Sequence, residues 1–231
     1  MSSDLLSTLN PAFTKLDLSK WPINLIEKID FTQLSQLEEL DVSNIGLTEL
    51  PRRLPITLKK LYCSYNDFSN NDSLLELSNL INLEYLNCSN CKLSSLNYTP
   101  PNLKILICRE NELHSLDNLP QSLIILNCHW NNISHLDYLP FGLQILLCSY
   151  NPIDTLNNLP PLLKILACVK CKIKNLDNIP DSIEKLECQK NYISRFARLP
   201  ANLKELTCFS NPFIYTFIPT IQNIEKALSD E

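Results

Sequence analysis

The chain has 231 residues, of which 45% are hydrophobic and 19% charged, and its formal net charge is −5. These proportions indicate a folded soluble protein and exclude a disordered chain. Acidic and basic residues are interspersed without a basic stripe, and no apolar run is long enough to span a bilayer, so we expect neither a nucleic-acid nor a membrane partner.

The N-terminal segment, residues 1–13, has no basic stretch followed by a hydrophobic one, so it does not resemble a signal peptide. Ten cysteines without such a signal favour reduced thiols and an intracellular, cytoplasmic location. We expect residues 4–9 to form a short helix that covers the first structural repeat. Only two glycines occur, Gly46 and Gly142, so asparagine and proline are the candidates for turning the chain.

A repeat begins near residue 13 and continues to about residue 212. Its template is L-P-x-x-L-x-x-L-x-C-x-x-[N/C]-x-I-x-x-L, as in "LPQSLIILNCHWNNISHLDY" at 119–138. Each copy predicts a short strand, such as 125–129, followed by an inward turn and an extended, polyproline-like return segment. Ten copies are recognised by their second core position, which is, in chain order, Leu18, Val42, Cys63, Cys88, Cys108, Cys128, Cys148, Cys168, Cys188 and Cys208.

Three segments outside this template predict helical turns. The first is at 23–29, and the second, "NNDSLLELSNL" at 70–80, is expected to be capped by Asp72 or Asn71. The third, at 219–229, predicts a C-terminal capping helix with Pro219 in its first turn. The apolar residues expected to face inward are Leu74, Leu77 and Leu80 in the second segment and Ile221, Ile224 and Leu228 in the third.

Two C-x-x-C pairs, at 88–91 and 168–171, have the spacing of zinc and redox motifs. However, Cys91 and Cys171 fall in a column that six other repeats fill with asparagine, where the side chain is expected to turn inward and bond the backbone. We therefore predict buried structural thiols rather than a metal or redox site. Disulfides remain an alternative, although side chains in register on parallel strands point the same way, which suits a disulfide poorly. The asparagines of this column are Asn66, Asn111, Asn131, Asn151, Asn191 and Asn211.

The repeat resembles the short leucine-rich repeats of bacterial type III secreted effectors, closely over residues 96–212 and more loosely over 13–95. The cysteine column and the low glycine content also resemble leucine-rich repeat proteins of giant DNA viruses. This resemblance implies an α/β repeat solenoid, an arc with a concave parallel sheet, a mostly extended convex side and short helical caps. We expect a single domain over residues 1–231. The ubiquitin-ligase activity of some such effectors is not expected, because only 23 residues follow Cys208.

Function in a solenoid resides in the variable outward positions of its strands. Here those positions are unusually apolar in the middle repeats, and such a face predicts binding of a protein partner in a non-enzymatic role. The alternative is that β-branched residues simply favour strands. The predicted partner-binding residues are Ile105, Ile107, Ile125, His129, Trp130, Ile145, Leu147, Tyr150, Ile165 and Val169, with Ala167 beside them.

Other hypotheses are weaker. The same apolar face allows self-association into a homo-oligomer with a structural role. An aspartate column, Asp117, Asp137 and Asp177, allows Ca²⁺ binding but fits Asx-type turns better. The three histidines show no nucleophile with an orienting acid, so neither an enzyme nor a cofactor is expected.

Overall fold

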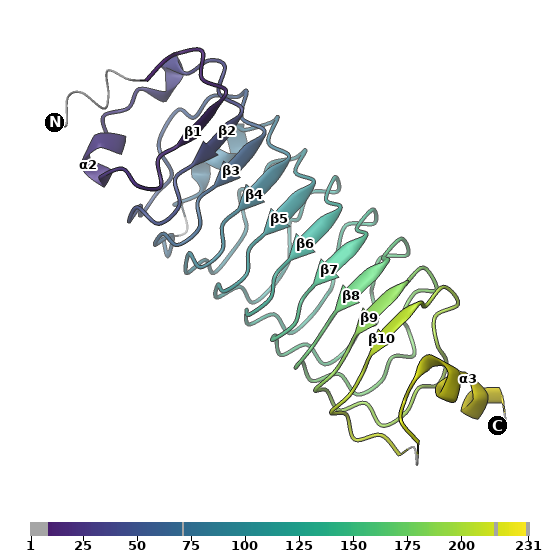
Figure 1. The fold of residues 1–231 in the computed structure, drawn as a ribbon. Helices are drawn as coiled ribbons and strands as arrows, with labels where there is room; N and C mark the ends of the chain where they lie inside the picture. The colour runs from purple at the N-terminus through teal and green to yellow at the C-terminus, as the bar shows by residue number, and fades with distance from the viewer. Residues whose placement is uncertain (1–8, 71, 215–216, 230–231) are drawn as a thin grey trace. The chain divides into compact units, whose positions relative to one another are not determined.

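The computed structural model describes residues 9–70, 72–214 and 217–229, and these form two compact units. One unit comprises residues up to 112 together with 120–123, and the other comprises 113–119 and the residues from 124 onward. Each unit is a solenoid of stacked coils with a parallel sheet and few helices (Figure 1), which confirms the predicted fold class. None of the helices in the described residues is both long and apolar enough to cross a membrane.

The first unit contains five strands that pair side by side in register, with one leucine at the centre of each. They are β1 (Lys15–Asp17), β2 (Glu39–Asp41), β3 (Lys60–Tyr62), β4 (Tyr85–Asn87) and β5 (Ile105–Ile107). Its longer coils hold α2 (Ile23–Ile26), the 3₁₀ helix η1 (Phe31–Gln33) and the 3₁₀ helix η2 (Leu75–Asn79).

The second unit repeats the same arrangement with greater regularity. Its strands are β6 (Ile125–Asn127), β7 (Ile145–Leu147), β8 (Ile165–Ala167), β9 (Lys185–Glu187) and β10 (Glu205–Thr207), and helix α3 (Ile221–Ser229) follows them. In its return segments a proline begins each turn. The carbonyl of Pro140, for example, accepts the Leu143 N–H at 3.0 Å.

The core explains the sequence period. In β6 the central Leu126 is fully buried, its neighbours Ile125 and Asn127 are half-buried, and the following Cys128 is again fully buried. This alternation is what a strand with one buried face requires. Because the coils within each unit are in register, the strand leucines from β2 to β5 and from β6 to β9 form a buried column in their unit, with the second core residues in a column beside it.

After every strand from β2 to β10 the chain turns at a residue with left-handed backbone, two positions after the second core residue. The φ angles lie between 51° and 60° although none of these residues is glycine. Left-handed backbone costs a non-glycine residue about 1–2 kcal/mol, and hydrogen bonds between coils hold it in place, as from the Trp130 N–H to the Ser149 carbonyl at 3.0 Å. These residues are Asn44, Tyr65, Asn90, Glu110, Trp130, Tyr150, Lys170, Lys190 and Ser210. The expected role of asparagine in the turns is confirmed at the next position, where Asn66 and Asn111, for example, bond the turn carbonyls.

Short helices occur in the three predicted segments, but Asp72 does not cap the second one as predicted. Leu74, Leu77 and Leu80 are buried as expected, but the segment is a 3₁₀ helix that no side chain caps. The Asp72 carboxylate instead accepts a hydrogen bond from the Tyr98 hydroxyl at 2.7 Å, so the prediction that Asp72 caps this helix is wrong. The alternative cap, Asn71, and the helix expected at 4–9, apart from residue 9, lie outside the described residues.

Helix α3 confirms the C-terminal element. Ile224 is fully buried, and Ile221 and Leu228 are half-buried beside it. The Thr220 hydroxyl accepts the Asn223 N–H at 3.2 Å and therefore caps the helix. Pro219 precedes this cap, so its predicted place in the first helical turn is wrong.

Candidate functional site

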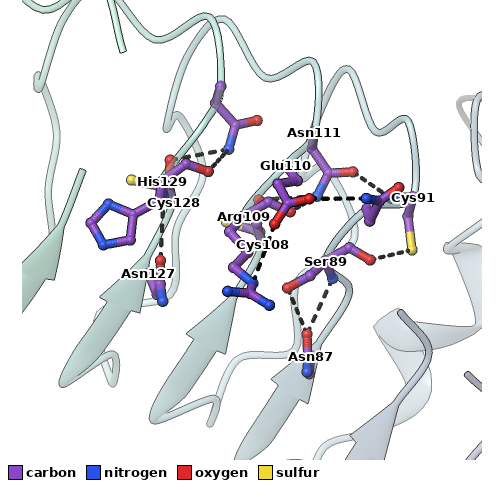
Figure 2. Close-up of polar contacts among 12 residues, drawn as sticks. Asn87, Ser89, Cys91, Cys108, Arg109, Glu110, Asn111, Asn127, Cys128 and His129 are labelled. Atoms are coloured by element: carbon purple, nitrogen blue, oxygen red, sulfur yellow. Dashed lines mark hydrogen bonds and ion pairs between the residues drawn. The ribbon is translucent and has the colours of Figure 1, made fainter. Parts of the chain in front are cut away.

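In six coils the turn that follows the strand is held by an inward asparagine. In the first unit, the Asn111 amide donates to the carbonyls of Cys88 and Cys108 at 2.9 and 3.0 Å. Its oxygen accepts the N–H groups of Cys91 and Leu93 at 2.9 and 3.0 Å (Figure 2). One buried side chain thus satisfies four backbone groups from two coils, which would otherwise be buried without partners.

Cysteine replaces this asparagine in two coils, as the sequence predicts. The Cys91 thiol donates to the carbonyls of Cys63 and Ser89 at 3.2 and 3.3 Å. Cys171 makes longer contacts of 3.7 and 3.8 Å to Cys148 and Val169. Both thiols therefore have the structural role proposed for them.

The cysteines lie in the apolar surroundings of structural thiols. All ten are buried thiols, and none is half of a disulfide. Burial raises the pKa of Cys91 and of Cys171 to about 11, although neighbouring backbone N–H groups act in the opposite direction. A reactive cysteine requires a lowered pKa. Among the described residues, no group of three or more His, Cys, Asp or Glu side chains is placed to hold a metal ion.

The outward positions of β6, β7 and β8 in the second unit form the candidate binding surface, which we call the strand face. Ile125, Ile145 and Ile165 pair in register and are half-buried, so this ladder partly covers itself. Leu147 and Val169 are also half-buried, and Ala167 is buried. The strand face is therefore mostly apolar, and its side chains are half-buried or buried rather than fully exposed.

An aromatic pair borders the strand face. Trp130 and Tyr150 stack with their ring centroids 3.9 Å apart and an interplanar angle of 9°, and Trp130 remains 53% exposed. The Lys170 ammonium lies 5.4 Å from the centroid of the Tyr150 ring. Since these three residues occupy the left-handed positions of successive coils, the backbone turn itself sets their side chains in a row.

His129 serves the backbone of the strand face. Its Nδ1 accepts the Ser149 N–H at 2.8 Å, and the Ser149 hydroxyl oxygen accepts the Val169 N–H at 2.9 Å. In other coils this N–H donates to the side chain two positions earlier in the same coil. The Ser89 N–H, for example, donates to the Asn87 side-chain oxygen at 3.2 Å (Figure 2). The corresponding residues before Ser149 and Val169 are Leu147 and Ala167, which have no side-chain acceptor. No pattern within a single repeat indicates this relay between coils.

The remaining predicted residues are placed as follows. Ile105 and Ile107 lie half-buried on β5 in the first unit, and all the others belong to the second. In the aspartate column, the Asp137 carboxylate accepts a hydrogen bond from the Asn158 amide at 2.7 Å. Asn157 likewise accepts one from Asn178 at 2.9 Å. This column therefore links neighbouring coils through Asx side chains.

No protein-family model matches the sequence, and no curated protein matches it. Among solved structures, the chain is similar to YopM, a leucine-rich effector protein from Yersinia pestis, with 34% identity and a TM-score of 0.72. The match covers 79% of this chain and 51% of YopM, so the chain spans about half the length of that protein.

Two further structures share the fold at 22% identity. The functional domain of InlJ from Listeria monocytogenes, which includes a cysteine ladder, matches with a TM-score of 0.65 over 90% of this chain and 57% of its own. TLR13 in its complex with ssRNA13 matches with a TM-score of 0.70 over 87% of this chain and 33% of its own. The chain is therefore a leucine-rich repeat protein, and its twenty-residue repeats are similar to those of the Yersinia effector.

Proposed function

We propose that this protein is a non-enzymatic binding module whose protein partner contacts the strand face of the second unit. The observation on which the proposal rests is the in-register ladder of Ile125, Ile145 and Ile165 beside the stacked pair of Trp130 and Tyr150. Tryptophan and tyrosine are among the residue types that most often dominate the binding energy of protein interfaces. Strand propensity alone accounts for the isoleucines but not for the exposed, stacked tryptophan.

We infer a protein partner from this surface and not from the fold. The fold does not determine the kind of partner, because TLR13, which shares it, is found in a complex with RNA. The likeness to YopM supports an effector-like binding role for this chain. The buried thiols with raised pKa suit a reducing, intracellular compartment.

The test replaces Ile125 and Ile145 together by aspartate. Both side chains are half-buried on a strand surface, so we expect the double variant to fold, as judged by circular dichroism, and to lose capture of the partner from a host lysate. Leu162→Asp with Ile218→Asp is the matched control, because both residues are exposed and apolar but lie off the strands. Capture by the Ile125/Ile145 variant at the level of the control would disprove the site.

Self-association is the second candidate, and the same ladder favours it, because two flat apolar faces pack together well. Light scattering at increasing micromolar concentration distinguishes the two. A mass that doubles for the native chain but not for the Ile125/Ile145 variant means that the face binds a second copy.

A further inference from the structure

A group of basic side chains lies next to the strand face, on the loops that follow β8 and β9. In the first loop Cys171 and Ile173 are buried while the residues between and around them are exposed, so alternate side chains point outward. The second loop has the same pattern. The exposed basic residues, which we call the basic flank, are Lys170, Lys172, Lys174, Lys190 and Arg195.

The basic flank has no acidic residue within its own loops, and the coil before it carries one, Asp154, at the position that matches Lys174. The loops 169–175 and 189–195 contain no Asp or Glu. On the strand side of the same unit, Lys185 pairs with Glu187 and Lys204 with Glu184, at 3.2 and 2.7 Å. No ion pair of the basic flank is found within the described residues, and the Lys170 ammonium lies over Tyr150.

The backbone beneath the basic flank is held by hydrogen bonds to the neighbouring coils. The Lys170 N–H donates to Gln189 at 3.0 Å, and the Lys172 N–H donates to Ile153 at 2.7 Å. The Lys190 N–H donates to Phe209 at 3.1 Å. The fold therefore fixes the backbone positions from which these exposed side chains extend, and their shared positive charge attracts an acidic ligand.

The basic flank adjoins the strand face directly, because Lys170 and Lys190 follow Val169 and Gln189 in the chain. We infer that the partner presents a segment in which carboxylates alternate with aliphatic side chains. The carboxylates bind the basic flank while the aliphatic groups cover Ile145 and Ile165. This inference rests on the proposed function and specifies the chemistry of its partner.

The aromatic pair favours an acidic protein segment over single-stranded nucleic acid. Such nucleic acids bind by stacking bases on open aromatic faces. Trp130 and Lys170, from the coils before and after Tyr150, both lie against the Tyr150 ring. The faces of Tyr150 are thus already occupied, whereas the lysines remain accessible to carboxylates.

The experiment measures fluorescence anisotropy of a labelled peptide of alternating Glu and Leu with the full chain. We expect binding that weakens as salt is raised and falls about tenfold or more in Lys172→Glu with Lys174→Glu. The control is Lys164→Glu with Lys226→Glu, which makes the same change of net charge away from the basic flank and should leave the affinity nearly unchanged.

Three results would overturn the inference: no binding at millimolar peptide, equal binding of an alternating Gln and Leu peptide, or equal losses in the two lysine variants. Tighter binding of oligouridine would assign the basic flank to nucleic acid instead. Ile145→Asp separates this inference from the proposed function. If only Ile145→Asp weakens peptide binding, the strand face is the site and the basic flank has no part in it. If only the Lys172/Lys174 variant weakens peptide binding, the basic flank is the site and the proposed role of the strand face is wrong.

Discussion

Coils with an inward asparagine and coils with an inward cysteine make the same turn after the strand, but with different hydrogen bonds. Asn111 uses its amide nitrogen and its oxygen, at distances of 2.9 to 3.0 Å to four backbone groups. Cys171 donates only weakly, at 3.7 and 3.8 Å. In the Cys171 coil the turn thus forms without a side-chain acceptor.

The backbone adjusts to the missing acceptor. The Asn66 oxygen accepts the Leu47 N–H at 3.0 Å, and the Asn111 oxygen accepts the Leu93 N–H at the same distance. The corresponding group before Cys91 is the Phe68 N–H, and it donates to the Cys91 main-chain carbonyl at 2.8 Å instead. The Cys91 coil therefore keeps this hydrogen bond by shifting it from side chain to backbone.

The largest expected difference between asparagine and cysteine turns is in the loss of stability at alkaline pH. The folded pKa of Cys91 and of Cys171 is about 11, above the ordinary value of 9.0, because burial disfavours the thiolate. A raised folded pKa means that stability is complete below pH 9 and is lost as pH rises toward 11, since only the unfolded chain ionises there. Each of the two turn thiols contributes roughly 2 kcal/mol to this loss, and burial also raises the pKa of Cys63, Cys88 and Cys108.

Urea unfolding between pH 8 and pH 11 measures this effect. The variant with asparagine at both positions 91 and 171 should lose less stability over the same range than the native chain. Equal losses in the two proteins would show that the turn thiols titrate as exposed groups do.

Asn111→Leu tests the asparagine coil. Leucine is apolar, so the carbonyls of Cys88 and Cys108 and the N–H groups of Cys91 and Leu93 lose their partner in the core. We expect a loss of about 3 kcal/mol or more in the free energy of unfolding, since each unsatisfied buried group costs about 1–3 kcal/mol.

Asn111→Cys is its control and should lose only about half as much, because the thiol keeps a donor. Chemical denaturation of the two variants gives the comparison directly. Equal losses would mean that side-chain volume, and not hydrogen bonding, determines which residues the turn accepts.

The sequence predicted the features that every coil repeats. The twenty-residue period located the strands, the buried leucine and cysteine columns and the inward turn, because core positions are restricted in the same way in each coil. It did not reveal the residues with left-handed backbone, since hydrogen bonds between coils impose that conformation on Trp130, Glu110 and Lys190 regardless of their type. The His129–Ser149–Val169 relay and the basic flank were missed for a related reason, because both arise from residues about twenty positions apart that only the stacking brings together.

The smallest expected change in stability distinguishes the two cysteine turns from each other. Cys171→Asn should raise the free energy of unfolding by about 1 kcal/mol, because an amide replaces two long sulfur contacts with hydrogen bonds of ordinary length. Cys91→Asn should gain less, because the Cys91 thiol already lies 3.2 and 3.3 Å from its two carbonyls and its neighbour Phe68 has rearranged around it. Thermal and urea denaturation of the two single variants rank these gains. A larger gain at position 91 than at 171 would contradict the view that contact length in the native turn sets the cost of the cysteine.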